Sequence, residues 1–262
     1  MVIASSPTPQ TLPLKVRWEK LPEDYKLPND PVDNITQPAL AAALTDSLSQ
    51  AGRIADTALT LTNYGVCATV NDRIVVKAPD WAYVPQTTVA RAEIERSYTP
   101  RLEGDIPAIV MEFVSETEGG EYSSKPTHPP GKWFFYESVL QIPYYAIFEP
   151  VSGDLELYRL NDAGRYTAQV REENGLYWVE SMQLFLGTWQ GEREQRQGYW
   201  LRWWDAQGQL LLWGIERANQ EAQRAEQEAQ RAEQEAQRAE QEAQRAERLR
   251  AQLRAAGIEP TD

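Results

Sequence analysis

The run Ile106-Pro-Ala-Ile-Val-Met-Glu-Phe-Val114 decides the fold of this 262-residue sequence. It is short and almost wholly apolar, which is typical of a central strand that is buried on both faces. A carboxylate at Glu112 would be costly to bury alone, so the run predicts a partner for it: a cation, a lysine or a water at the end of the sheet. Two other readings stay open, in which Glu112 faces solvent or forms a purely structural ion pair with Lys132.

The segments around this run predict an α/β fold with a mixed sheet flanked by helices. An amphipathic helix should begin near Thr36 and end at Gly52, and residues 132–140 should form a helix with an aromatic face. Asn71-Asp72 joins two β-branched runs and predicts a tight hairpin. Further strands are expected at residues 64–70, 73–77, 143–148, 155–160 and 165–170, the last two forming a second hairpin.

Composition limits the classes of function. The net charge is -13, and an acidic chain is a poor non-specific DNA coat protein, although its acids could gather a divalent cation. Cys67 and His128 are each the only residue of their kind, which excludes an internal disulfide and Cys/His zinc sites. We expect a soluble, cytoplasmic protein without membrane contact, because the sequence shows neither a secretory signal nor a long apolar run.

The C-terminal part is a heptad repeat. From Ala225, the heptad Ala-Glu-Gln-Glu-Ala-Gln-Arg occurs three times in succession, which places alanine at the a and d positions of a coiled coil. The repeat could form a stalk for a homodimer or for a partner protein, or it could remain a solvated single helix. The predicted organisation is an extended arm at 1–34, a folded domain at 35–215, a coiled-coil tail at 216–256 and a short end at 257–262.

Two acids and a lysine form the candidate site. Hydrolysis of a phosphodiester needs a cation on the phosphoryl oxygen, an activated water and positive charge where negative charge develops. Asp80 and Glu112, on neighbouring strands, can hold Mg²⁺, with Mn²⁺ as the alternative ion, because these cations prefer oxygen ligands. The backbone carbonyl of Phe113 is a candidate third ligand. Lys132 is the first choice for the positive charge and Lys125 the second.

Together these features resemble the PD-(D/E)xK nuclease superfamily and, more closely, the bacterial Uma-type family of restriction endonucleases. The resemblance covers roughly residues 20–260. The matching segments are Pro79-Asp80, Val110–Glu116, Lys132–Tyr136, Pro143–Pro150, Tyr199–Trp203 and the heptads that lead to Pro260.

The resemblance implies a restriction-endonuclease-like fold and Mg²⁺-dependent cleavage of DNA, with Asp80, Glu112 and Lys132 as catalytic residues. The superfamily lysine normally lies two residues after the acid, where this chain has Val114. The Uma-type pattern instead places the lysine on the following helix, which matches Lys132.

Two further hypotheses accompany the resemblance. An acid from the first helix completes some sites of this superfamily, and Asp46 or Asp33 would be that acid here. The alternative function is a catalytically inactive scaffold with a nuclease fold, which oligomerises or binds partner proteins through the heptad tail.

Overall fold

The computed structural model describes residues 14–26, 35–114 and 120–256. The chain divides into two compact units, residues 1–211 and 212–262, which are described separately. Of the predicted N-terminal arm, only residues 14–26 belong to the described part. The predicted short end at 257–262 lies outside it.

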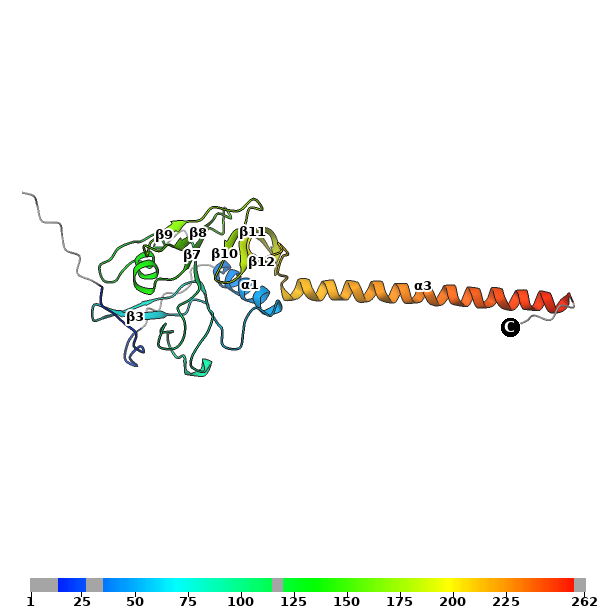
Figure 1. Ribbon diagram of the computed structural model, residues 1–262, viewed down its shortest axis with the longest axis horizontal. Coiled ribbons are helices and arrows are strands. Elements are labelled where there is room, and N and C mark those ends of the chain that lie inside the picture. The colour runs from blue at the N-terminus through cyan, green and yellow to red at the C-terminus, as the bar shows by residue number, and fades with distance from the viewer. Residues whose placement is uncertain (1–13, 27–34, 115–119, 257–262) are drawn as a thin grey trace, which may run out of the picture. The chain divides into compact units, whose positions relative to one another are not determined.

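A six-stranded mixed sheet forms the centre of the first unit, in the order β2-β5-β6-β7-β8-β9. Figure 1 labels β7, β8 and β9 of this sheet. Its neighbouring strands are antiparallel, except for β6 and β7, which are parallel. The predicted α/β class with a mixed sheet is therefore confirmed. The strands are β2 (Leu59–Leu61), β5 (Trp81–Val84), β6 (Ile109–Phe113), β7 (Tyr144–Phe148), β8 (Leu155–Leu160) and β9 (Tyr166–Ala168).

The predicted central strand is confirmed in β6, where all five residues are buried. Strand β7 is also buried throughout, as expected for a parallel pair covered on both faces. Parallel neighbours require a crossover connection. Here the crossover contains α2 (Lys132–Phe134) and a π-helical segment, η2 (Phe135–Leu140).

The helix predicted at 132–140 is thus present, but most of it has the wider π geometry. Five of the six residues of η2 are buried, and four of them join the main apolar core together with residues of the central sheet. These four are Phe135, Tyr136, Val139 and Leu140. Gln141 follows with φ of 57°, and the left-handed backbone there ends the segment.

The hairpin predicted at Asn71-Asp72 is confirmed by β3 (Val66–Val70) and β4 (Arg73–Lys77). Both turn residues have positive φ, 48° at Asn71 and 60° at Asp72, as a type I′ turn requires. Strand β1 (Val16–Arg17) pairs with β3 and completes a three-stranded sheet. A second three-stranded sheet consists of β10 (Tyr177–Val179), β11 (Leu184–Arg193) and β12 (Arg196–Trp204).

Helix α1 (Thr36–Gln50) and the 3-10 helix η1 (Arg91–Glu93) complete the first unit. The leucines at 40, 44 and 48 are all buried, which confirms the apolar face predicted for this helix. Gly52 has φ of +65°, a backbone conformation that glycine adopts without strain, so it ends the helix as predicted.

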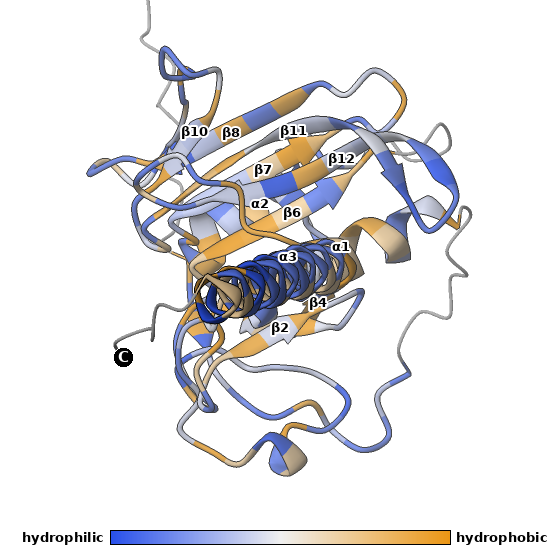
Figure 2. Ribbon diagram, turned by 90° about the vertical axis from the view of Figure 1, so that its right-hand side faces the viewer, coloured by the Kyte–Doolittle hydropathy of each residue, from blue (hydrophilic) through white to orange (hydrophobic). Residues whose placement is uncertain are grey.

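The second unit is dominated by one 42-residue helix, α3 (Gly214–Ala255). It begins with a capping contact, because the Glu216 Oε2 atom accepts a hydrogen bond from the Trp213 N–H at 2.8 Å. None of its residues is buried, and most of its ribbon is hydrophilic in the end-on view of Figure 2. Among the described residues, no helix is long and apolar enough to cross a membrane.

Candidate active site

Asp80 directly precedes β5, and the pairing of β5 with β6 carries it to Glu112. Trp81 faces Met111 in the antiparallel register, so the next position brings Asp80 beside the end of β6. The Asp80 Oδ2 atom accepts a hydrogen bond from the backbone N–H of Phe113 at 2.6 Å. Burial raises the pKa of Asp80, while the Phe113 N–H and the charge of Lys132 oppose the shift.

Glu112 is fully buried in β6 and holds two hydrogen bonds. Its Oε2 atom accepts from the Lys132 ammonium at 3.0 Å, and its Oε1 atom accepts from the Tyr136 hydroxyl at 2.7 Å. Burial, and to a lesser extent the nearby charge of Asp80, raise the pKa of Glu112 to about 8 against the opposing effects of Lys132 and Tyr136. The predicted partner of this buried acid is therefore a lysine in the structure.

Lys132 is the first residue of α2, and the chain before it is tightly packed. A Cβ atom on the preceding Gly131 would lie 1.9 Å from the Ser123 carbonyl oxygen, so only glycine fits there. Burial lowers the pKa of Lys132, but the charge and hydrogen bond of Glu112 outweigh this effect and leave that pKa above its ordinary value. Lys125 is exposed, and the structure brings Lys132 to Glu112 instead.

Phe113, the expected third ligand, lies between two polar contacts. Its N–H donates to Asp80, and its carbonyl accepts a hydrogen bond from the Gln37 side-chain amide at 2.9 Å. A carbonyl oxygen has two lone pairs, so this contact leaves one acceptor position. Gln37 lies in the first turn of α1, and the sequence offered no pattern that could identify it as part of the site.

Of the two acids considered for the first helix, the described one, Asp46, does not join the site. Asp46 forms an ion pair with Arg193 at 3.1 Å on a different part of α1. Asp33 lies outside the described residues.

Glu121 is a buried acid that sequence reasoning missed. Its Oε1 atom lies 3.9 Å from the Lys132 Nζ atom, and its Oε2 atom is buried without a hydrogen-bond partner. The residue belongs to a turn in a polar, glycine-rich loop, where neither periodicity nor an apolar context distinguishes one glutamate from another.

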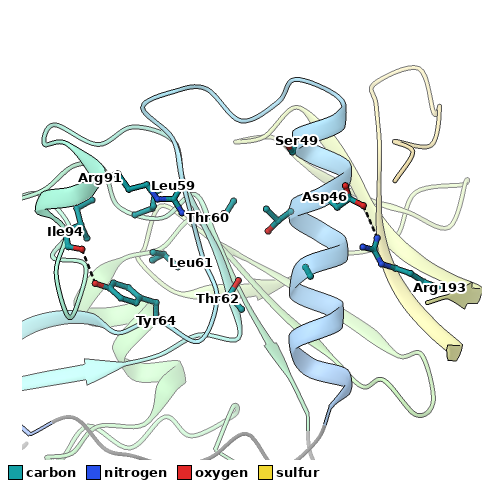
Figure 3. Close-up of a pocket in the computed structure, with 12 residues that line it drawn as sticks. Asp46, Ser49, Leu59, Thr60, Leu61, Thr62, Tyr64, Arg91, Ile94 and Arg193 are labelled. Atoms are coloured by element: carbon teal, nitrogen blue, oxygen red, sulfur yellow. Dashed lines mark hydrogen bonds and ion pairs between the residues drawn. The ribbon is translucent and has the colours of Figure 1, made fainter. Parts of the chain in front are cut away.

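Two depressions lie near the site. A narrow pocket of about 20 Å³ is bordered by Asp80, and an open groove of about 730 Å³ runs beside α1, β2 and η1. Thr62 lines both, so the two depressions adjoin at this residue. Figure 3 shows Asp46 and Arg193 paired at one side of the groove and Arg91 at the other. Arg91 is exposed and forms no ion pair with another described residue.

Two neighbouring carboxylates, Asp80 and Glu112, offer oxygen ligands for a metal ion. Among the described residues, no three His, Cys, Asp or Glu side chains are grouped so that they could hold a metal ion. Mg²⁺ commonly uses one or two carboxylates and keeps several waters, so the pair Asp80 and Glu112 fits this ion better than zinc, which needs a nearly complete protein shell.

One family model matches the chain. It bears the description "Putative restriction endonuclease", carries the name Uma2, and matches residues 30–190. This range contains Asp80, Glu112, Glu121 and Lys132. No curated protein matches the chain.

Proposed function

The chain belongs to the Uma2 family of restriction-endonuclease proteins, and on this premise we propose that it hydrolyses DNA phosphodiester bonds with the help of a divalent cation. The observation that carries the proposal is the convergence of Asp80, Glu112 and Lys132. Lys132 donates a hydrogen bond to Glu112, and Asp80 accepts one from the backbone N–H of Phe113, the residue that follows Glu112. The corresponding fold would be restriction-endonuclease-like.

Asp80 and Glu112 would hold Mg²⁺ or Mn²⁺, with the Phe113 carbonyl as a further oxygen ligand. When bound, the cation supplies Lewis-acid chemistry that polarises the phosphoryl group and makes an attacking water more acidic. The chain prepares both acids for this task, because the Phe113 N–H fixes Asp80 and the Tyr136 hydroxyl fixes Glu112.

Lys132 would stabilise the negative charge that develops on the phosphate. Its side chain is only 20% exposed, so its charge acts through a medium that screens less than water. The same ammonium would orient the attacking water. Lys132 lies at the start of α2. From there its ammonium would reach the place that the superfamily lysine reaches from a strand.

The groove beside α1 is the route by which a DNA strand would reach Asp80. Its lining includes the hydroxyl side chains of Thr45, Ser49 and Thr60, which can donate hydrogen bonds to phosphate oxygens. Arg91 adds an exposed positive charge to the lining of the groove on the side away from α1. These contacts would provide local attraction on a chain whose net charge of -13 opposes general DNA binding.

Cleavage of supercoiled plasmid tests the proposed function. Purified protein with Mg²⁺ or Mn²⁺ is expected to nick the plasmid, and chelation by EDTA should abolish the reaction. Asp80→Asn, Glu112→Gln and Lys132→Met should each lower the rate by about 10²-fold or more, as expected for groups that stabilise the transition state. Glu156→Gln, an exposed carboxylate on β8, is the control and should retain the wild-type rate.

Equal nicking by the wild-type and Asp80→Asn proteins would contradict this assignment. If no protein nicks plasmid or linear DNA with either cation, the second candidate function gains support. That candidate is an inactive scaffold, and the observation in its favour is the 42-residue helix α3, which could oligomerise the chain or bind a partner. Partner binding should then survive the Asp80→Asn change.

A further inference from the structure

Glu121 has no assigned role in the site, yet it is among the most deeply buried acids of the first unit, with 2% of its surface exposed. Its main chain is held firmly, because the hydroxyl of Tyr145 on β7 donates a hydrogen bond to the Glu121 carbonyl oxygen at 2.9 Å. Its side chain is less well satisfied, since Oε2 is buried and accepts no hydrogen bond. An unsatisfied buried acceptor is expensive, so its retention needs a reason.

The distances point to the reason. The Lys132 ammonium lies 3.0 Å from Glu112 and 3.9 Å from Glu121, so it is hydrogen-bonded to the first carboxylate and only close to the second. A shift of the ammonium by about 1 Å towards Glu121 would create a hydrogen bond of ordinary length there. The Lys132 ammonium is therefore hydrogen-bonded to Glu112 and has Glu121 within reach.

A divalent cation on Asp80 and Glu112 changes this balance. It would neutralise Glu112 and would repel an ammonium group that shares the same carboxylate, because like charges a few ångströms apart interact strongly in a partly buried site. Glu121 then offers a second carboxylate within reach of Lys132.

We propose that Glu121 is a positioning residue that receives Lys132 when the cation binds. The inference rests on the proposed function. In the structure, Lys132 is hydrogen-bonded to the Glu112 Oε2 atom. With a cation held by Asp80 and Glu112, Lys132 would turn to Glu121, which would free this oxygen from the lysine and keep the ammonium beside the position of the phosphate. Glu121 thus increases the affinity for the cation without contacting it.

The test is a double-mutant cycle on Mn²⁺ affinity, measured by isothermal titration calorimetry without DNA. Glu121→Gln should weaken Mn²⁺ binding by about tenfold, as coupled neighbouring groups do, because Lys132 loses its alternative partner. Lys132→Met should bind Mn²⁺ at least as tightly as wild type, because no ammonium competes for Glu112. In the Lys132→Met background, Glu121→Gln should have no further effect.

Glu103→Gln is the matched control. Glu103 is also a buried glutamate near a lysine, with its Oε1 atom 3.8 Å from the Lys20 Nζ atom, but it belongs to a different region and should leave Mn²⁺ affinity unchanged. Thermal unfolding in EDTA provides a second readout. Glu121→Gln should not lower the melting temperature, because it removes an unsatisfied buried charge, whereas a structural role would lower it.

Each result decides between the alternatives. Unchanged Mn²⁺ affinity in Glu121→Gln would overturn the inference. Equal weakening in the wild-type and Lys132→Met backgrounds would also overturn it and make Glu121 a direct ligand. If the wild-type protein binds no Mn²⁺, or if Asp80→Asn leaves binding intact, the proposed function itself fails, and the two failures are thus distinguished.

Discussion

At the scale of single residues, Glu112 is the most informative side chain. It is fully buried, next to another acid, and yet held by a lysine and a tyrosine. Its pKa is raised from the ordinary 4.5 to about 8, chiefly by burial. The residue therefore binds a proton in the folded state at pH values where the unfolded chain has released it.

This pKa shift predicts that the metal-free protein becomes less stable as pH rises. Between about pH 4.5 and pH 8, the folded state holds one proton more than the unfolded state at this site. The free energy of unfolding should therefore fall with pH, by at most about 1.4 kcal/mol per pH unit from this group. This stabilisation is complete below about pH 4.5 and lost above about pH 8. Urea unfolding in EDTA measures the slope.

Glu112→Gln is the control for this prediction, because glutamine does not titrate. Its free energy of unfolding should vary less with pH over the same range, and added Mg²⁺ should stabilise the wild-type protein most at the alkaline end. A slope that is the same in Glu112→Gln and in wild type would show that other groups cause it.

Sequence reasoning found some residues of the site and missed others for a physical reason. Glu112 was identifiable because a charge in an apolar run is costly, and the cost itself predicts a partner. Glu121 and Gln37 lie in polar surroundings in the sequence, where a charged or amide side chain costs nothing. Their places at the site result from long-range folding, which brings a loop and the start of α1 to the end of β6.

At the scale of elements, the start of α2 determines where Lys132 points. Gly131 packs so closely on Ser123 that a methyl group would collide with the Ser123 carbonyl. Gly131→Ala should therefore destabilise the fold by about 1–3 kcal/mol and lower plasmid nicking, because Lys132 is displaced. Chemical unfolding and nicking assays check this. Gly120→Ala, which meets no atom within 4 Å, should be neutral in both, and equal losses in the two variants would contradict the prediction.

The elements themselves were predictable where local chemistry specifies them. The hairpin at Asn71-Asp72 follows from its turn residues, and the buried strand β6 follows from its apolar run. The division into one six-stranded and two three-stranded sheets was not predictable, because it depends on pairing between distant segments. The π geometry of η2 was missed as well, since the spacing of its apolar residues also suits an ordinary helix.

At the scale of the whole molecule, the heptads of α3 carry an arrangement of charges that bears on association. With alanine at a and d, every e and g position from residue 221 to residue 247 is glutamate. Two copies of this seam would bring glutamates together in either orientation. Within one helix, some of these acids accept hydrogen bonds from glutamine four residues later. Gln230 donates to Glu226, Gln237 to Glu233 and Gln244 to Glu240.

We therefore predict that the chain does not dimerise through its tail at neutral pH and low salt. A full-length variant with lysine in place of the eight glutamates of the seam should also not self-associate. Mixing the two proteins should produce a one-to-one complex, because glutamate then faces lysine. Analytical ultracentrifugation distinguishes these states. A wild-type dimer that dissociates when Ala225, Ala232 and Ala239 become Asp would contradict the prediction. The eight glutamates are Glu221, Glu226, Glu228, Glu233, Glu235, Glu240, Glu242 and Glu247.

The uniformity of these heptads has a consequence for how the tail can change over generations. Three identical units in succession favour gain or loss of a unit when the gene is copied. Each unit alters the length of α3 by about 10.5 Å and turns its faces by only about 20°. The length of the tail can therefore change in steps of one heptad while the chemical character of its surface stays the same.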